Sequence, residues 1–170
     1  MISVFALVSI PIPFSPVPVT LQVLGVYLAS TILGPVYGAF ACLIYLLLGA
    51  AGLPVFAGAT SGPPVLFGPF GGYLFSYPVA ALAGGFIAKA RSNSKKRDGL
   101  RVLVSCLVSI LIVYGIGVSW LAFYLGLSAY QGIVLGAVPF VPLDALKAAV
   151  AAVIAARVRW AHVPLPVNRS

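Results

Sequence analysis

The chain has 170 residues, of which 62% are apolar and 7% charged, and its mean hydropathy is +1.14. Soluble globular domains carry roughly 25% charged residues, so this composition excludes a water-soluble fold for lack of polar surface. It also excludes a disordered chain, because such chains are rich in charge and poor in apolar residues. A helix needs about 20 apolar residues to cross a hydrocarbon layer of ~30 Å, so the length allows roughly six crossings at most. We therefore expect an all-α, polytopic integral membrane protein with a single bundle.

Apolar runs separated by Gly, Pro and charged stretches predict one transmembrane domain over residues 1–170. The first run is short, because Met1 to Ile10 would rise only about 15 Å as a helix. Four prolines between Pro11 and Pro18 then forbid a continuous helix. The predicted spans cover residues 1–12, 19–33, 36–51, 70–90, 102–125 and 142–158.

Nine of the ten Lys and Arg residues fall into two clusters. The first occupies the loop at 91–101 and its flanks, and the second holds Arg157, Arg159 and Arg169. Short basic loops beside spans face the cytoplasm, so we expect both this loop and the C-terminus to be cytoplasmic. The net charge of +8 is then a topology signal, and no nucleic-acid partner is expected.

Two cytoplasmic segments must be separated by an even number of membrane crossings. Counting the predicted spans back from the basic loop and the C-terminus then places three irregular segments on the outer face. These are the segments around 11–18, 52–69 and 126–141, whereas the Gly34-Pro35 turn falls on the inner side. The 52–69 segment carries no charge and is rich in Gly and Pro. Non-helical backbone at membrane depth must pack against protein or line a cavity, so we expect this segment to fold back as a lid or re-entrant loop. The alternative is an ordinary hydrophobic surface loop.

Asp144 and Lys147 are the ionisable side chains that stand apart from the basic clusters and Asp98. Counted back from Arg157 at the inner boundary, they lie about 20 and 15 Å up a helix, inside the hydrocarbon layer. A charged side chain at the centre of a span raises the free energy of membrane insertion by at least ~2.5–3.5 kcal/mol. At positions i and i+3 the two share a helix face. They are interpreted either as a buried pair that pins helices together or, preferably, as the recognition groups for a polar ligand entering from outside.

The motifs of common membrane enzymes are missing from the sequence. There is no Walker A loop, no HExxH and no GxSxG, so we expect neither ATP hydrolysis by this chain nor enzymatic activity. Cys42 and Cys106 each lie in an apolar run, without a neighbouring ligand, and are expected to be buried rather than metal-bound. His162 is expected at the membrane interface. We therefore predict no metal and no cofactor.

Four strings occur in order along the chain: PVPVTLQ (16–22), GLPVFAG (52–58), GPFGGYL (68–74) and PFVPLDALK (139–147). In this order and spacing they closely resemble the BioY family, the biotin-specific S components of energy-coupling factor (ECF) transporters. The resemblance covers nearly the whole chain.

The resemblance implies a six-helix S-component fold in the cell membrane of a prokaryote, surrounded by membrane lipid. It also implies high-affinity biotin uptake, with an ECF module of one transmembrane coupling protein and two ABC ATPases as partner. The family's biotin pocket is built from the first outer loop, the long loop before the fourth helix and the start of the sixth helix. By position, the resemblance implies these substrate-binding residues: Gln22, Phe56, Thr60, Tyr73, Asp144 and Lys147.

Biotin chemistry fits these residue types. Its ureido ring offers two N–H donors and a carbonyl acceptor, so Asp144 can accept while Lys147 or Thr60 donates. The carboxylate of biotin is an alternative partner for Lys147. The bicyclic ring and the valeryl chain suit Phe56 and Tyr73.

The sequence departs from the family at two points. The small-residue AxxxA contact for the coupling protein is not visible in the first helix, where Ala6 has Ile2 and Ile10 at the four-residue spacings. Phe70 stands where a small polar residue is expected. Two alternative functions remain: an S component for thiamine or riboflavin, and a small membrane enzyme or assembly factor that uses Asp144 and Lys147 as a proton relay.

Overall fold

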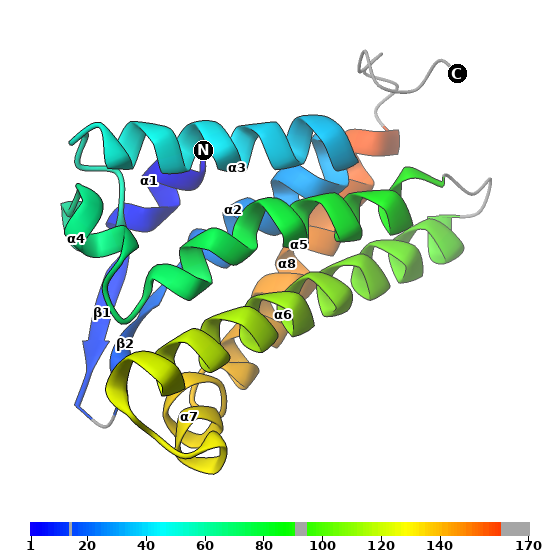
Figure 1. The fold of residues 1–170 in the computed structure, drawn as a ribbon. Coiled ribbons are helices and arrows are strands. Elements are labelled where there is room, and N and C mark those ends of the chain that lie inside the picture. Colours follow the sequence, from blue (N-terminus) through cyan, green and yellow to red (C-terminus); the bar gives the residue numbers. More distant parts are fainter. Residues whose placement is uncertain (14, 91–94, 161–170) are drawn as a thin grey trace.

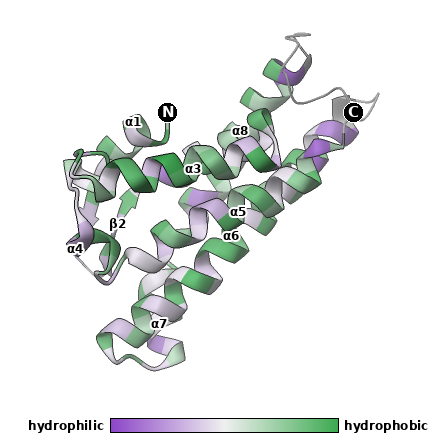
Figure 2. Ribbon diagram, turned by 45° about the horizontal axis from the view of Figure 1, so that its top comes forward, coloured by the Kyte–Doolittle hydropathy of each residue, from purple (hydrophilic) through white to green (hydrophobic). Residues whose placement is uncertain are grey.

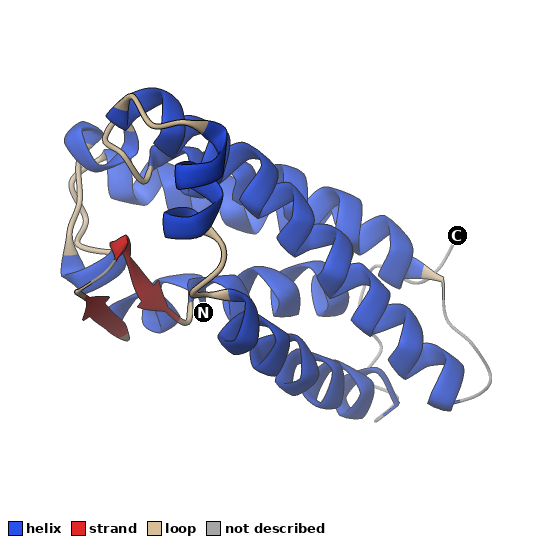
Figure 3. Cartoon of the chain, turned by 90° about the horizontal axis from the view of Figure 1, so that it is seen from below, coloured by secondary structure: helices blue, strands red, loops and turns tan. Residues whose placement is uncertain are grey.

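The computed structural model describes residues 1–13, 15–90 and 95–160. The elements, in chain order, are α1 (Ile2–Leu7), β1 (Ser9–Ile12), β2 (Ser15–Thr20), α2 (Gln22–Leu28), a π-helical turn η1 (Ala29–Leu33), α3 (Pro35–Ala50), a 3₁₀ turn η2 (Ala57–Ala59), α4 (Pro63–Leu66), α5 (Gly71–Lys89), α6 (Lys95–Leu125), α7 (Ala129–Gly136) and α8 (Val141–Trp160). The predicted all-α class is confirmed, with one short hairpin added. The helices lie lengthwise beside one another (Figure 1), and the hairpin sits at one end of the bundle (Figure 3).

Two helices in the described part of the chain are long and apolar enough to cross a membrane by themselves. They are α5 and the stretch of α6 from Arg97 to Leu125. The pair formed by α7 and α8, bent by 53°, qualifies together as a third, broken span. Gln22–Leu33 and Pro35–Ala50 are shorter apolar helices. Three of the six predicted spans, 70–90, 102–125 and 142–158, therefore correspond to a helix or bent helix pair of spanning length in the described residues.

The predicted helix boundaries at the first internal turn agree with the structure. The π-helical turn η1 ends at Leu33, and α3 begins at Pro35. Gly34 between them has φ 84°, a left-handed value that glycine adopts without a steric penalty. Proline is favoured at the first position of a helix because its missing N–H would have no partner there. The sequence GP therefore ends one helix and starts the next.

The prediction of one helical span over 1–12 is wrong. Helix α1 ends at Leu7, and β1 pairs with β2 as an antiparallel hairpin, with Ser9 opposite Thr20 and Ile10 opposite Val19. The register shifts after Ile10, at Pro11, which has no N–H to donate to the ladder. Both strands are edges of a two-stranded sheet, where proline is tolerated. The proline-rich segment thus forms a short hairpin with an irregular register.

Two other boundaries also differ from the prediction. Helix α6 starts at Lys95, so the predicted loop 91–101 is helical over its second half. The predicted irregular connection at 126–141 contains helix α7, which starts with a capping box in which Ser128 and Gln131 satisfy each other's backbone N–H groups. A Ser-x-x-Gln pattern is a helix-start signal that was available in the sequence.

The two ends of the bundle have different character. The hairpin, α4 and α7 gather at one end, and the end of α5, the start of α6 and the end of α8 gather at the other (Figure 1). Hydrophilic residues concentrate at that second end (Figure 2). The three irregular segments predicted to share a face therefore share one end of the molecule. Residues 91–94 and 161–170, with Arg91, His162 and Arg169, lie outside the described residues.

Candidate ligand-binding site

A cavity of about 330 Å³ opens at the end of the bundle that carries the hairpin. Its wall comes from β2, the start of α2, the 52–69 segment, α5, α6, the end of α7 and the start of α8. The wall is mostly apolar, with side chains such as Val17, Val65, Leu74 and Phe140. All six predicted binding residues line it: Gln22, Phe56, Thr60, Tyr73, Asp144 and Lys147. The volume lies at the lower end of the range typical of small-molecule sites.

Asp144 and Lys147 form a buried ion pair on one wall of the cavity. The Lys147 Nζ lies 2.7 Å from Asp144 Oδ1, and the two residues are 7% and 5% exposed. Tyr114 of α6 donates a hydrogen bond of 2.5 Å to Asp144 Oδ2. Both carboxylate oxygens therefore have a partner, which offsets the cost of burying the charge. The pair adds a charged group to a wall that is otherwise largely apolar.

Helix α8 begins in a way that presents this pair to the cavity. Pro142 lies in its first turn, and the backbone N–H of Asp144 donates to the Phe140 carbonyl at 2.8 Å. An acidic side chain in the first turn interacts favourably with the helix dipole. Lys147 follows one turn later on the same face.

Gln22 is held by three neighbouring hydroxyl groups. Its Nε2 donates to Tyr45 Oη at 2.6 Å, and its Oε1 accepts from Tyr77 Oη at 3.2 Å and from Thr20 Oγ1 at 3.1 Å. These partners come from α3, α5 and the end of β2. The Gln22 side chain therefore joins three elements at the cavity wall and is fixed before any ligand arrives.

Tyr73 connects α5 to the last residue of α7. Its hydroxyl donates to the Gly136 carbonyl at 2.8 Å. A Cβ on Gly117 would lie 2.3 Å from the Tyr73 ring, so glycine at this position of α6 makes the space for that ring. The ring thus has a fixed place between two helices at the cavity.

The 52–69 segment packs back onto the bundle at its middle. Phe56 is fully buried, with its ring 5.5 Å from the Tyr45 ring in an edge-to-face contact. The Phe56 N–H donates to the Thr60 carbonyl at 3.0 Å, which closes a tight loop. Leu66 is also buried. The segment therefore lines the cavity and buries Phe56 and Leu66 against the bundle, while Leu53 and Phe67 are exposed, and its role as a lid stays a prediction.

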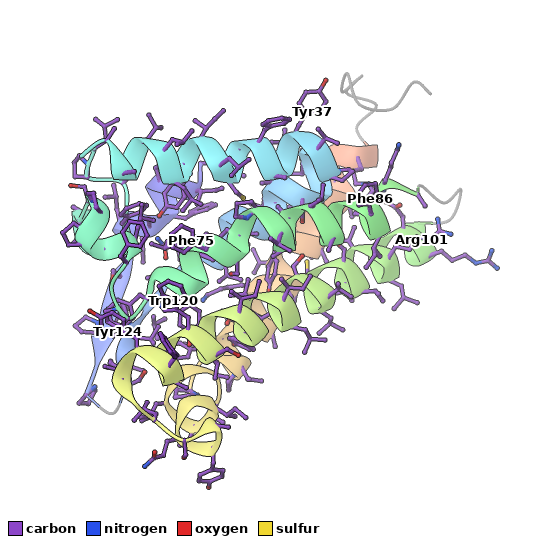
Figure 4. The ribbon with its side chains drawn as sticks, viewed as in Figure 1. Tyr37, Phe75, Phe86, Arg101, Trp120 and Tyr124 are labelled. Atoms are coloured by element: carbon purple, nitrogen blue, oxygen red, sulfur yellow. The ribbon has the colours of Figure 1, made fainter. Side chains whose placement is uncertain are left out.

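The far end of the same segment is attached to α6. Trp120 Nε1 donates to the Gly68 carbonyl at 2.9 Å, and the Trp120 ring contacts Phe75 (Figure 4). Thr60 differs from the other predicted residues because it is exposed and its hydroxyl donates to the Ala57 carbonyl at 2.9 Å. It lies at the rim rather than the wall of the cavity.

Two tyrosine hydroxyl groups at the cavity were missed by the sequence analysis, whereas Thr20 lies inside the PVPVTLQ string that carries the resemblance. Tyr77 follows Tyr73 by four residues, so it carried a signal. Tyr114 lies in the apolar run of α6, and its contact with Asp144 comes from helix packing. No local pattern distinguishes it from a lipid-facing or core tyrosine.

Comparison with known proteins places this chain among transporters. The profile of the BioY family matches residues 1–163. The chain is 44% identical to the biotin transporter BioY of Thermotoga maritima over 88% of its length and 85% of that protein. It is 41% identical to the probable biotin transporter BioY of Pyrococcus horikoshii, over the same shares of the two chains.

A solved structure is also similar across most of the chain. It is the crystal structure of the S-component for biotin from an ECF-type ABC transporter, with a TM-score of 0.81 and 30% sequence identity. The similarity covers 94% of this chain and 87% of that one. With a family profile and several relatives matching over nearly its full length, the chain belongs to the BioY family.

Proposed function

We propose that this chain binds biotin with high affinity at the outer side of a prokaryotic cell membrane and serves its uptake as the S component of an ECF-type transporter. The observation that carries the proposal is the cavity in which an apolar wall meets one buried, hydrogen-bonded ion pair, Asp144 and Lys147. The names of the relatives and of the similar solved structure support the same ligand.

The chemistry of the cavity matches the two parts of biotin. The thioether ring and the valeryl chain are apolar and suit the aromatic and aliphatic wall. The ureido group and the carboxylate are strongly polar and need charged or hydrogen-bonding partners when buried. Asp144 accepts, Lys147 donates, and Tyr114 keeps the carboxylate of Asp144 in place. In this proposal biotin is bound without a metal or cofactor, by Gln22, Phe56, Thr60, Tyr73, Asp144 and Lys147.

Energised transport requires a partner in this proposal. The described chain contributes a binding cavity and a helical body, and the partner is an ECF module with a transmembrane coupling protein and two ABC ATPases. The basic end of the bundle faces the cytoplasm together with the C-terminus, and membrane lipid surrounds the exposed apolar helix faces. An enzymatic role for Asp144 and Lys147 is disfavoured, since the relatives are named as transporters.

Thermal stabilisation by a panel of vitamins tests the ligand. Detergent-solubilised protein is heated with biotin, thiamine or riboflavin, each at the same concentration. A ligand present at 100 times its Kd stabilises the folded state by about 2.7 kcal/mol. We expect a rise in Tm with biotin alone. Stabilisation by thiamine or riboflavin, or by none of the three, would contradict the proposed ligand.

A further inference from the structure

A second buried ion pair lies at the basic end of the bundle, far from the cavity. It joins Arg159, in the last turn of α8, to Asp98, in the first turn of α6, with 3.1 Å between Arg159 Nη2 and Asp98 Oδ1. The two residues are 6% and 1% exposed. The Arg159 Nη2 also donates to the Ala88 carbonyl at 2.7 Å, near the end of α5. One guanidinium thus joins three helix ends.

The interface of α8 offers little else to fix its position along its neighbours. Among the described side chains of α8, the buried apolar ones are all alanines: Ala148, Ala151, Ala152 and Ala155. Small residues let helices approach closely, but they project no large side chain that must fit one particular groove. Sliding such a helix along its partner therefore meets weak steric resistance.

The four buried alanines of α8 lie between two polar contacts, and both contacts join α8 to α6. Near the cavity, Tyr114 donates to Asp144, and at the basic end Arg159 pairs with Asp98. The helices run in opposite directions, and the contacts lie sixteen positions apart on α6 and fifteen on α8. At 1.5 Å per residue these separations are about 24 and 22 Å, so both contacts fit one antiparallel register.

We infer that the Asp98–Arg159 pair is a positioning pair for ligand binding: it fixes the register of α8 against α6 and thereby holds Asp144 and Lys147 at the cavity wall. A buried polar group that sets helix register is a well-attested use of such residues. A slip of one turn would move Asp144 by about 5.4 Å, beyond hydrogen-bond reach of Tyr114. The inference rests on the proposed function for its affinity measurement and on geometry alone for its distance measurement.

The test replaces the whole pair, so that no buried charge is left without its partner. Replacing both members of a buried pair by apolar residues is often neutral or stabilising, whereas removing one is strongly destabilising. The double variant Asp98→Leu/Arg159→Met should therefore melt close to the parent protein. We expect its biotin affinity, measured by calorimetry on folded protein, to fall at least tenfold. Arg157→Met removes one exposed charge from the same end of α8 and should leave affinity unchanged.

A distance measurement reads the register directly. Leu111 on α6 and Val153 on α8 are 68% and 57% exposed and accept spin labels, in a background where Cys42 and Cys106 are replaced by Ala. We expect the label-to-label distance distribution to shift or broaden by several ångström in the double variant and to stay unchanged in Arg157→Met. An unchanged distribution, or a shifted one with parental affinity, would overturn the inference.

A third variant covers the case in which the double variant does not fold. Arg159→Lys keeps the positive charge but replaces the guanidinium, whose Nη2 donates to both Asp98 and Ala88, with the ammonium group of a shorter side chain. We expect weaker biotin binding with a smaller loss than in the double variant, and parental affinity would overturn the inference. If the parent protein itself does not bind biotin, the proposed function fails, and the distance measurement alone decides whether the pair sets the register.

Discussion

At the scale of single residues, Asp144 is the group on which the cavity depends most. It accepts from Tyr114 and pairs with Lys147, so one carboxylate organises two other side chains of the wall. Sequence reasoning could find Asp144 and Lys147 because a charge in an apolar run is costly and therefore conspicuous. It could not find Tyr114, because a tyrosine in such a run is unremarkable until packing brings it to a carboxylate.

Asp144→Asn should weaken biotin binding at least tenfold. The amide keeps the size of the side chain but loses the charge-assisted acceptor, and it leaves buried Lys147 without its anionic neighbour. A charged hydrogen bond contributes roughly 1.5–3 kcal/mol, and 1.4 kcal/mol corresponds to one decade in Kd. Lys147→Ala should act in the same direction. Calorimetric titration of folded variants measures both effects.

The control for these variants is Arg157→Ala, which removes an exposed charge far from the cavity on the same helix and should leave affinity unchanged. A purely structural pair would give another pattern: both cavity variants would melt earlier while the folded fraction bound biotin normally. That pattern would contradict the assignment of Asp144 and Lys147 to the ligand.

At the scale of elements, the 52–69 segment depends on one close approach to α3. The Phe56 ring lies over Gly49, where a Cβ would come within 2.0 Å of the ring. The ring is also fully buried, although it belongs to a segment rich in Gly and Pro. Sequence composition indicated that this segment folds back, but the glycine that receives the phenylalanine could be identified only in three dimensions.

Gly49→Ala should therefore displace the Phe56 ring and loosen the cover of the cavity. Overpacking of this kind costs about 1–3 kcal/mol, so we expect a lower Tm and weaker biotin binding. The matched control is Gly115→Ala on α6, where a Cβ would meet nothing within 4 Å. Alanine in an open helical position should leave Tm unchanged or raise it. Thermal melting with and without biotin gives both readouts, and equal behaviour of the two variants would contradict this account of the cover.

At the scale of the whole molecule, the two ends of the bundle predict its orientation in the membrane. The start of α6 and the end of α8 carry the basic residues, and the hairpin, α4 and α7 lie at the opposite end (Figures 1 and 2). Positive charge is retained on the cytoplasmic side, so the cavity should open outward.

Cysteine labelling in intact cells checks this orientation. In a background with Cys42 and Cys106 replaced by Ala, Arg97→Cys at the basic end should react only with a membrane-permeant reagent. Tyr130→Cys on α7, where the tyrosine is 77% exposed, should react with an impermeant reagent. The reverse labelling pattern would place the cavity on the cytoplasmic side and contradict uptake from outside.

The family resemblance pointed to Gln22, Phe56, Thr60 and Tyr73 at the cavity. The composition and local pattern of the sequence by themselves determined the membrane class, the turn at Gly34-Pro35, the basic end and the charged pair Asp144 and Lys147. These features depend on composition, on proline and glycine geometry, and on charges in apolar surroundings, all of which are local. Tertiary structure decided the hairpin that replaces the end of the first predicted span, the contact of Tyr114 with Asp144 and the pairing of Asp98 with Arg159. Those features join residues far apart in the chain, and their energies arise from burial and partner geometry that exist only once the helices have packed.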